Sequence, residues 1–208
     1  MKLGTTWIRQ SVVAVAVLVM MTVILGVVYP AVVWGVSRID RSSAEGSVVT
    51  DSAGCRVGSA LIGIDPQAEP GRPDGYLHAR VLGAADDPMA PGDPAASAAS
   101  NQGPSSVTLA GWIESRRAII AEREDVRPDQ VPVDAVTGSG SSLDPHISPA
   151  YADIQVPRLA RVHGMPPEEV REVISSHTEG RQFGVLGEPR VNVLEVNLAL
   201  GLTAPNCG

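Results

Sequence analysis

The sequence contains few aromatic side chains and almost no lysine. Aromatic residues make up 3% of its 208 residues, Phe183 is the single phenylalanine, and Lys2 is the single lysine. Such a composition argues against an aromatic-lined ligand cage and requires a core of Val, Leu, Ile and Ala, which suits a small mixed α/β (α+β) body. The length accommodates one ordinary domain and a short appendage.

Metal-ligating residues are also sparse, and their spacing does not fit a metal site. The four histidines stand far apart in the sequence: His78, His146, His163 and His177. Neither a helical His pair nor a CxxC motif is present, so no zinc or other metal site is predicted. The two cysteines, Cys55 and Cys207, could form a disulfide if they lie in an oxidising compartment.

One long apolar run is the clearest positive feature. No charged residue occurs from Ser11 to Val28, and the apolar character continues to Arg38. About 20 such residues cross a hydrocarbon core, and Trp7, Tyr29 and Trp34 stand where aromatic rings meet the headgroups. A cleaved signal peptide has an apolar region of about 7–15 residues before a small-residue cleavage site, and neither feature is found here. We therefore predict a transmembrane helix over residues 11–36, with Tyr29 and Pro30 in its exit region.

The basic residues near this run predict its orientation. Lys2 and Arg9 lie in the tail of residues 1–10, and a long following domain translocates largely regardless of charge. We expect a cytoplasmic N-terminus and an extracytoplasmic domain over residues 37–208. That domain keeps 14 of the 16 basic residues and all 23 acidic ones, a formal charge of −9. So acidic a domain is not expected to bind nucleic acid.

The first half of this domain is poor in regular structure. Val48–Thr50 and Arg56–Ile64 are predicted strands of a hairpin around the turn Asp51-Ser52-Ala53-Gly54. A Pro/Gly-rich insertion follows at about 65–104, interrupted by Tyr76-Leu77-His78-Ala79-Arg80. It has too few apolar residues for a core of its own, and loops of this length typically face a partner or lack order.

The second half predicts helices. Apolar residues spaced through 106–124 indicate an amphipathic helix, and residues 131–136 indicate an extended segment. Pro149 opens a helix that ends at His163-Gly164, and Pro166-Pro167 opens another that ends near His177. The fold class is therefore a small α+β extracytoplasmic domain anchored by one N-terminal transmembrane helix.

The stretch VTGSGSSLDPHISPAYA, residues 136–152, gathers glycines, hydroxyls, a carboxylate and an imidazole. It lacks the lysine of a P-loop and the spacing of a GxSxG elbow. A structural interpretation makes Asp144-Pro145 a turn and Ser148 the cap of the next helix. The alternative is a membrane-anchored serine hydrolase that uses Ser139 or Ser141 with His146, although triads are normally assembled from separate loops.

Six motifs are spread over nearly the whole chain. They are Gly58-Ser59-Ala60-Leu61-Ile62-Gly63, Ser100-Asn101-Gln102-Gly103-Pro104-Ser105, Val131-Pro132-Val133-Asp134-Ala135-Val136-Thr137, Leu143-Asp144-Pro145-His146-Ile147-Ser148-Pro149, His177-Thr178-Glu179-Gly180-Arg181, and Gly187-Glu188-Pro189-Arg190-Val191-Asn192-Val193-Leu194-Glu195. With these motifs the chain resembles the C subunit of the Kdp-type potassium-transporting P-type ATPase. The chain departs from the family pattern at Arg80-Val81-Leu82-Gly83, at the glycine-serine run from Gly138 to Ser142, and in the tail after Gly201.

The resemblance implies an accessory subunit of a high-affinity, ATP-driven potassium import complex in a prokaryotic cell membrane. Its implied partners are a channel-like potassium-binding subunit, a P-type catalytic subunit and a small single-span subunit. The complex uses ATP and potassium, and the C subunit is implied to support assembly and to raise the ATP affinity of the catalytic subunit. No cofactor site is assigned to this chain, and it lacks the Asp-Lys-Thr-Gly-Thr motif that would form an aspartyl phosphate.

The same resemblance selects candidate residues for partner contact or for a structural motif. These are Asn101, Gly103, Ser139, Asp144, His146, His177, Glu179, Arg181, Glu188, Arg190 and Asn192.

Overall fold

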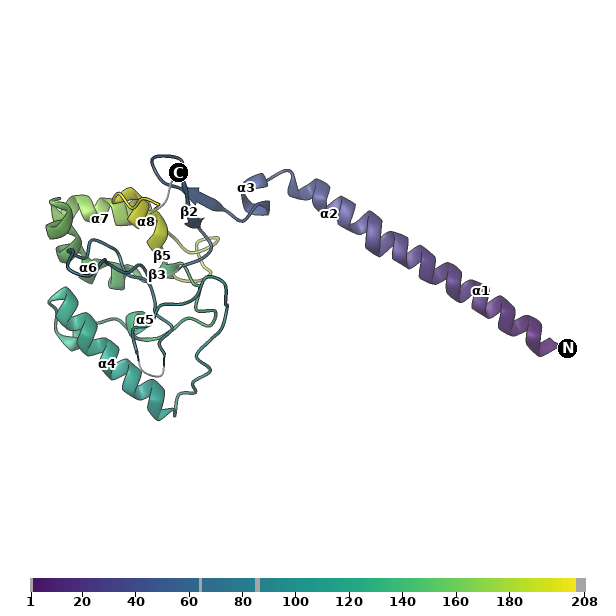
Figure 1. Ribbon diagram of the computed structural model, residues 1–208, viewed down its shortest axis with the longest axis horizontal. Coiled ribbons are helices and arrows are strands. Elements are labelled where there is room, and N and C mark those ends of the chain that lie inside the picture. Colours follow the sequence, from purple (N-terminus) through teal and green to yellow (C-terminus); the bar gives the residue numbers. More distant parts are fainter. Residues whose placement is uncertain (1, 64, 85–86, 205–208) are drawn as a thin grey trace. The chain divides into compact units, whose positions relative to one another are not determined.

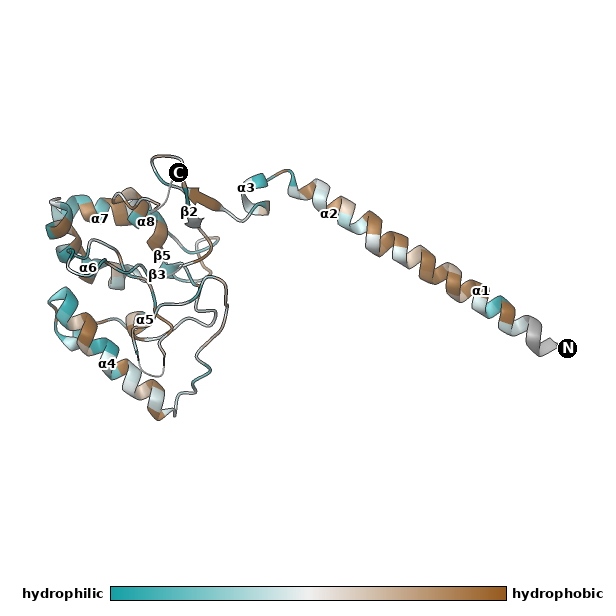
Figure 2. Cartoon of the chain, viewed as in Figure 1, coloured by the Kyte–Doolittle hydropathy of each residue, from teal (hydrophilic) through white to brown (hydrophobic). Residues whose placement is uncertain are grey.

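The computed structural model of the protein describes residues 2–63, 65–84 and 87–204 and divides into two units, Met1–Ser47 and Val48–Gly208. The first unit is almost entirely one helix. Helix α1 (Lys2–Val23) continues through the π-helical segment η1 (Ile24–Val28) into α2 (Tyr29–Ser37), and the short α3 (Arg41–Ala44) follows. Residues Thr6–Ser37 are long and apolar enough to cross a membrane, and their apolar character is evident in Figure 2.

The helix runs on past Tyr29 and Pro30. A proline inside a helix has no N–H to donate and crowds the preceding turn. Here the wider π-helical turn of η1 directly precedes Pro30, which stands at the start of α2. Because π-helical turns accommodate such interruptions, one continuous apolar helix covers the range predicted for the span. The cytoplasmic placement of residues 1–10 stays a prediction.

The second unit begins with the predicted hairpin. Strand β1 (Val48–Thr50) pairs antiparallel with β2 (Arg56–Ser59). The Asp51 carboxylate organises the turn, since its Oδ1 accepts hydrogen bonds from the backbone N–H groups of Ala53 (3.0 Å) and Cys55 (2.9 Å). The second strand ends at Ser59, earlier than predicted, because the chain turns away there and Gly63 N donates to Leu143 O instead (2.9 Å). Ile64, the predicted end, lies outside the described residues.

Three helices form as predicted because their ends are encoded locally. Helix α4 (Val107–Glu124) is capped by Ser106, whose Oγ accepts from Leu109 N at 3.2 Å. Helix α6 (Pro149–His163) is capped by Ser148 and ends at Gly164, which adopts a left-handed conformation (φ +65°). Helix α7 (Pro167–Ser176) starts at the Pro-Pro pair and ends before His177. Caps and prolines of this kind make helix limits readable from sequence.

The extended segment predicted over residues 131–136 is wrong. A 3-10 turn, η2 (Pro128–Gln130), is followed by the one-turn helix α5 (Val133–Val136). Pro132 precedes its first turn, Thr137 Oγ1 donates to Val133 O (2.9 Å), and Ala135 and Val136 are both buried. The chain from Val133 to Val136 therefore forms a helical turn that places Ala135 and Val136 in the core.

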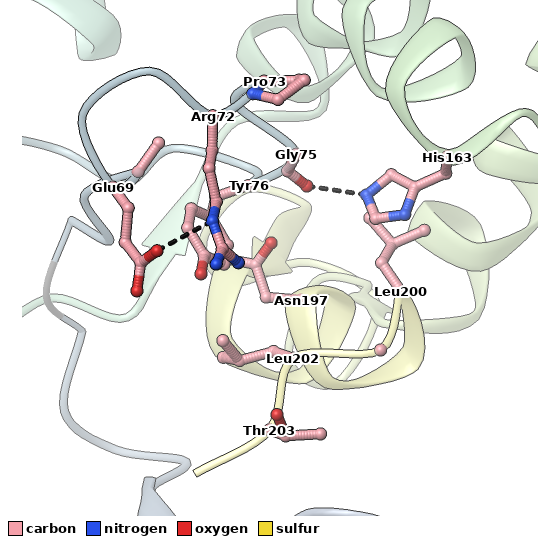
Figure 3. A pocket seen from close by; sticks show the side chains of 12 residues that line it. Glu69, Arg72, Pro73, Gly75, Tyr76, His163, Asn197, Leu200, Leu202 and Thr203 are labelled. Atoms are coloured by element: carbon pink, nitrogen blue, oxygen red, sulfur yellow. Dashed lines mark hydrogen bonds and ion pairs between the residues drawn. The ribbon is translucent and has the colours of Figure 1, made fainter. Parts of the chain in front are cut away.

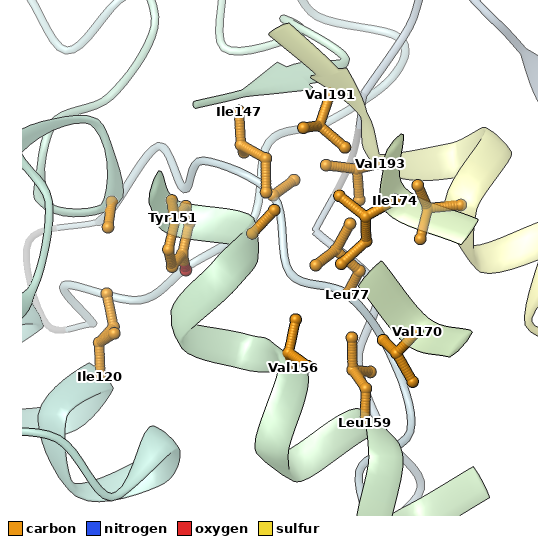
Figure 4. Packing of buried hydrophobic residues seen from close by; sticks show 14 of the residues in the cluster. Leu77, Ile120, Ile147, Tyr151, Val156, Leu159, Val170, Ile174, Val191 and Val193 are labelled. Carbon is orange, nitrogen blue, oxygen red and sulfur yellow. The ribbon is translucent and has the colours of Figure 1, made fainter. Parts of the chain in front are cut away.

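A small sheet and the helices enclose the core. Strands β3 (His146–Ile147), β5 (Arg190–Asn192) and β4 (Thr178–Glu179) form an antiparallel sheet in the order β3-β5-β4, and α8 (Val193–Ala199) follows β5 directly. Helices α6 and α7 pack against each other (Figure 1). Figure 4 shows the apolar side chains that meet between these elements, among them Ile120, Ile147, Tyr151, Val156, Leu159, Val170, Ile174, Val191 and Val193. The architecture is α+β, as predicted.

The 65–104 insertion has no core of its own, but it is not a surface loop throughout. Leu77 is fully buried among the helices, and Ala79 and Val81 are buried beside it. Two side-chain amides pair with its extended backbone: Asn197 accepts from Leu77 N (2.7 Å) and donates to Leu77 O (2.9 Å), while Gln155 accepts from His78 N (2.8 Å). Amide side chains thus replace a neighbouring strand, and buried backbone groups stay hydrogen-bonded.

The C-terminal segment returns to the first hairpin. Ala204 N donates to Asp51 Oδ2 (2.9 Å), so the chain passes beside the β1–β2 turn four residues before its last position. Cys207 lies outside the described residues, and its pairing with Cys55 stays a prediction.

Candidate functional site

The β3-β5-β4 sheet brings together motifs that lie up to 46 residues apart in the sequence. His146 of β3 pairs with Asn192 of β5, and Glu179 of β4 pairs with Arg190 of β5. The segments that carry Asp144, His146, Glu179, Arg190 and Asn192 therefore adjoin one another. This sheet is the candidate functional site.

The Asp144-Pro145-His146 segment is a hydrogen-bonded turn, as the structural interpretation predicted. Asp144 Oδ1 accepts from His146 N (3.0 Å) and lies 3.3 Å from His146 Nδ1. Val193 N donates to Pro145 O (3.0 Å), which joins the turn to the start of α8. Ser148 then caps α6, since its Oγ accepts from Tyr151 N at 3.0 Å.

Gly63 closes this turn from the other side. A Cβ at position 63 would overlap the backbone at Asp144 and Pro145. Glycine is therefore required by close backbone approach, which explains the last residue of the Gly58–Gly63 motif. The backbones of two motifs about 80 residues apart in the sequence are therefore in direct contact.

Arg80 links the turn to the glycine-serine run. Its guanidinium donates to Thr137 O (3.2 Å) and Gly138 O (2.7 Å), and its Nη1 lies 3.4 Å from Asp144 Oδ2. The guanidinium thus bonds to two carbonyls and a carboxylate at once, a pattern that its fixed fork of donors makes possible. Arg80 starts the segment in which the chain departs from the family pattern, yet its side chain makes these contacts.

A polar cavity of about 220 Å³ opens beside the turn. Its lining includes Asp144, His146, Glu188 and Arg190, four of the predicted site residues, together with Arg80 and Asp134. Asp134 is itself held by Ser148, whose N–H and Oγ–H both donate to its carboxylate at 2.8 Å. The cavity is thus lined by charges of both signs together with apolar groups such as Ile147 and Pro189.

The connection between β4 and β5 carries two ion pairs. Arg190 pairs with Glu179 at its base, and Arg181 pairs with Glu188 (2.7 Å) further along. All four are predicted site residues, and their charges cancel in pairs. These contacts are largely exposed, so each contributes little to stability, about 0–1 kcal/mol.

Asn192 and His177 have structural partners. Asn192 Oδ1 accepts from Glu195 N (3.2 Å) and so caps α8, while its Nδ2 donates to Ala60 O (3.0 Å). His177 Nδ1 lies 2.8 Å from Val173 O, at the end of α7, and His177 O accepts from Asn192 N (3.1 Å). Both side chains therefore fix element ends, and this role accounts for their place in the motif.

The remaining predicted residues lie apart from the sheet or lack catalytic geometry. Asn101 and Gly103 are exposed in the loop that leads to α4. Ser141 Oγ accepts from Leu143 N (3.1 Å) as part of a local turn. Within residues 87–204, no hydrogen bond joins the hydroxyl of Ser139 or Ser141 to the His146 ring. Nucleophile activation needs that bond, although it can be long in an unliganded enzyme.

A second cavity, of about 290 Å³, lies between the 68–76 loop and the end of α8 (Figure 3). His163 Nε2 lies 2.8 Å from Gly75 O, and Glu69 pairs with Arg72 (2.9 Å) on its rim. Its polar groups are thus engaged with each other, and sequence analysis assigned no role to them.

Sequence analysis missed a buried charged network. His78 is 5% exposed, its Nδ1 lies 3.1 Å from Asp65 Oδ1, and its Nε2 lies 2.6 Å from Asp74 Oδ2. Burial lowers the pKa of His78, but the hydrogen bonds to the two carboxylates outweigh it and raise the pKa above its ordinary value. Burial likewise opposes ionisation of Asp74, yet the His78 contacts lower the pKa of that carboxyl to about 2.

The network continues between α4 and α6. Arg158 donates to Glu124 Oε2 (2.9 Å) and to the carbonyls of Asp74 (2.8 Å) and Tyr76 (2.9 Å). Arg123 binds the other oxygen of Glu124 (2.6 Å) and the Tyr151 hydroxyl (3.1 Å). Burial raises the pKa of Tyr151 to about 12, against the opposing effect of Arg123. The acidic and basic groups of the network pair with one another inside the fold. The network thereby connects α4, α6 and the 65–84 segment. The sequence signal was the interruption at 76–80, where apolar and ionisable residues alternate.

These observations define a class of protein: a single apolar helix able to cross a membrane, joined to an α+β unit whose signature motifs meet in one small sheet. The chain belongs to the KdpC family, described as the c chain of the K+-transporting ATPase, whose profile matches residues 11–201.

Curated relatives agree with this assignment. A protein from Kineococcus radiotolerans is 43% identical over 97% of both chains, and one from Geobacter metallireducens is 40% identical over 92% of this chain and 97% of its own. A third, from Streptomyces coelicolor, is 39% identical over 92% of each chain. All three carry the name potassium-transporting ATPase KdpC subunit.

Proposed function

We propose that this chain is the accessory subunit of an ATP-driven potassium import complex, needed to assemble and stabilise that complex. The proposal rests on one observation above all, that the family's signature residues form a well-bonded sheet and a mixed-charge cavity instead of a nucleophile with its base. Partners supply the chemistry: a channel-like potassium-binding subunit, a P-type catalytic subunit and a small single-span subunit.

The apolar helix anchors the chain with residues 1–10 in the cytoplasm and the acidic unit outside. Lys2 and Arg9 support this orientation, because basic residues flanking a first span stay on the cytoplasmic side. In this position the unit, with its formal charge of −9, braces the potassium entrance of the channel-like subunit. An effect on the ATP affinity of the catalytic subunit then passes through the membrane partners, because ATP is cytoplasmic.

Two experiments test the assembly role. The tagged full-length chain is purified from native membranes in mild detergent, and the three partners are expected to co-purify, whereas deletion of residues 11–36 abolishes their recovery. The catalytic subunit, prepared without this chain, is then assayed for ATP hydrolysis. We expect a higher KM for ATP, restored by adding the full-length chain back. Equal KM values with and without the chain would remove the affinity role and leave assembly intact.

A labelling experiment tests the orientation. In a Cys55→Ser, Cys207→Ser background, Arg127→Cys provides a reporter, since the Arg127 side chain is 72% exposed. A membrane-impermeant maleimide is expected to label it in intact cells, while Lys2→Cys reacts in inverted vesicles alone. The opposite pattern would place the unit in the cytoplasm and permit direct contact with nucleotide.

A further inference from the structure

The loop between β4 and β5, residues 180–189, exposes a cluster of apolar side chains at its tip. Phe183 is 92% exposed, Val185 is 73% exposed and Leu186 is 57% exposed. Single exposed apolar residues are ordinary on protein surfaces, but a group of them on one loop marks an interaction site.

The loop holds its shape through its own hydrogen bonds. Gln182 and Leu186 exchange two backbone bonds, each 2.9 Å long, and Gly184 N donates to Arg181 O (3.0 Å). The Arg181–Glu188 ion pair adds a third connection across the loop. A loop ordered in this way loses little conformational entropy when it binds, which favours affinity.

The backbone conformation at the tip of the loop does not favour a phenylalanine at position 183. Phe183 has φ +52°, in the left-handed region where glycine and asparagine are favoured and a bulky residue is uncommon. The ring is almost wholly in solvent, so it does not stabilise the fold by packing. A residue that strains its backbone without contributing to the core is typical of a functional position.

The charges around the tip select among possible occupants. Arg181 is paired with Glu188, and Arg190 with Glu179, so the loop and its base have no net formal charge. A tip that binds anionic headgroups would offer unpaired Lys or Arg. An apolar centre with a rim of paired charges is the anatomy of a protein interface instead.

We infer that the 180–189 loop is a docking tip that inserts Phe183 into an apolar pocket on the extracytoplasmic surface of another subunit of the complex. The family description as a c chain supports a different subunit, rather than a second copy, as the occupant. This inference rests on the proposed function and adds to it a residue, a surface and the chemistry of the recognised pocket.

The test uses the full-length tagged chain in its complex. Phe183→Asn removes the ring while placing a residue suited to φ +52° at the tip, so we expect unchanged or slightly increased thermal stability of the chain. Dissociation of the partner subunits during washing in mild detergent should be about tenfold faster, as for an interface anchor. The matched control is Val107→Asn, because Val107 is 87% exposed at the start of α4 and is expected to leave dissociation unchanged.

A photo-crosslinking residue at position 183 identifies the occupant. A crosslink to another subunit of the complex supports the inference, whereas a crosslink to lipid or to a second copy of this chain overturns it. Equal dissociation of the Phe183→Asn and wild-type complexes also overturns it while leaving the proposed function standing. If the wild-type chain retains no other subunit, both the inference and the proposed function fail.

Discussion

Arg116 offers the sharpest test of how the irregular part of the domain is held. Its side chain is 1% exposed, and its guanidinium donates to the carbonyls of Pro88 (2.7 Å), Val136 (3.0 Å) and Leu82 (2.9 Å). It also lies 5.4 Å from the centre of the Trp112 ring. Burial lowers the pKa of Arg116 from its ordinary value, although an arginine stays protonated at any ordinary pH. One helix residue therefore binds both the loop that carries Leu82 and Pro88 and the end of α5 at Val136.

The substitution Arg116→Lys keeps the positive charge and removes the planar guanidinium with its several N–H donors. The ammonium of the shorter lysine side chain cannot donate to all three carbonyls, and we expect one of the three hydrogen bonds to survive. Each carbonyl left unpaired costs about 1–3 kcal/mol, so the free energy of unfolding should fall by about 3 kcal/mol. For a domain of this size that corresponds to a decrease of roughly 6–12 °C in Tm.

The assay is thermal and urea unfolding of the detergent-solubilised full-length chain, followed by circular dichroism. The control is Arg117→Lys, the next residue on the same helix, which is less buried and should change stability by under about 0.5 kcal/mol. If the two variants unfold at the same temperature, Arg116 does not hold the loop of Leu82 and Pro88 to the end of α5, and the reasoning is wrong.

Four further predictions concern pH and the contacts that hold the sheet in place. Because the folded pKa of His78 is raised, its stabilisation is complete below about pH 6.5 and is lost as pH rises through the folded pKa, so His78→Gln should abolish that alkaline slope in pH-dependent urea unfolding. Because the pKa of Asp74 is lowered to about 2, its stabilisation is present above the ordinary pKa of 3.8 and is lost on acidification towards pH 2; Asp74→Asn should flatten this acid limb, and an unchanged limb would argue against the contact. Asn192→Ala should cost about 2 kcal/mol by removing the α8 cap and the bond to Ala60 O, whereas Asn192→Asp keeps the cap and should cost about half as much in the same assay. Gly63→Ala should lower Tm clearly because its Cβ overlaps the Asp144-Pro145 backbone, whereas Gly111→Ala, which has open space inside α4, should stabilise by about 0.5–1 kcal/mol; equal effects would refute the close approach.

The helices were predictable because their limits depend on nearby residues. Ser106, Ser148 and Gly164 act within four residues of the helix ends that they set. The Asp144-Pro145 turn was predictable for the same reason, since its bonds reach two residues along the chain. The failure at 133–136 arose because valine favours strands in general, and tertiary burial of Ala135 and Val136 overrode that preference here.

The rest could not be predicted because it depends on distant partners. Leu77 looked like part of a loop, since the amide that pairs with its backbone belongs to Asn197. The motif residues were located by resemblance, but the sequence did not reveal that Glu179, Arg181, Glu188 and Arg190 would form two ion pairs with one another. The spacing of apolar residues also does not predict that Glu124 and Arg158 form a hydrogen bond in the interior.

The side-chain amides that pair with the insertion also impose an order on folding. Leu77 binds a residue 120 positions later in the chain, and His78 binds one 77 positions later. At synthesis rates of about 5–20 residues per second, the partner of Leu77 emerges roughly 6–24 s after Leu77 itself. During that interval the Leu77 backbone lacks the amide that pairs with it in the folded protein. The nascent chain is therefore open to proteases and misassociation until α8 is made, and translation pauses upstream of Asn197 should lower the yield of folded protein.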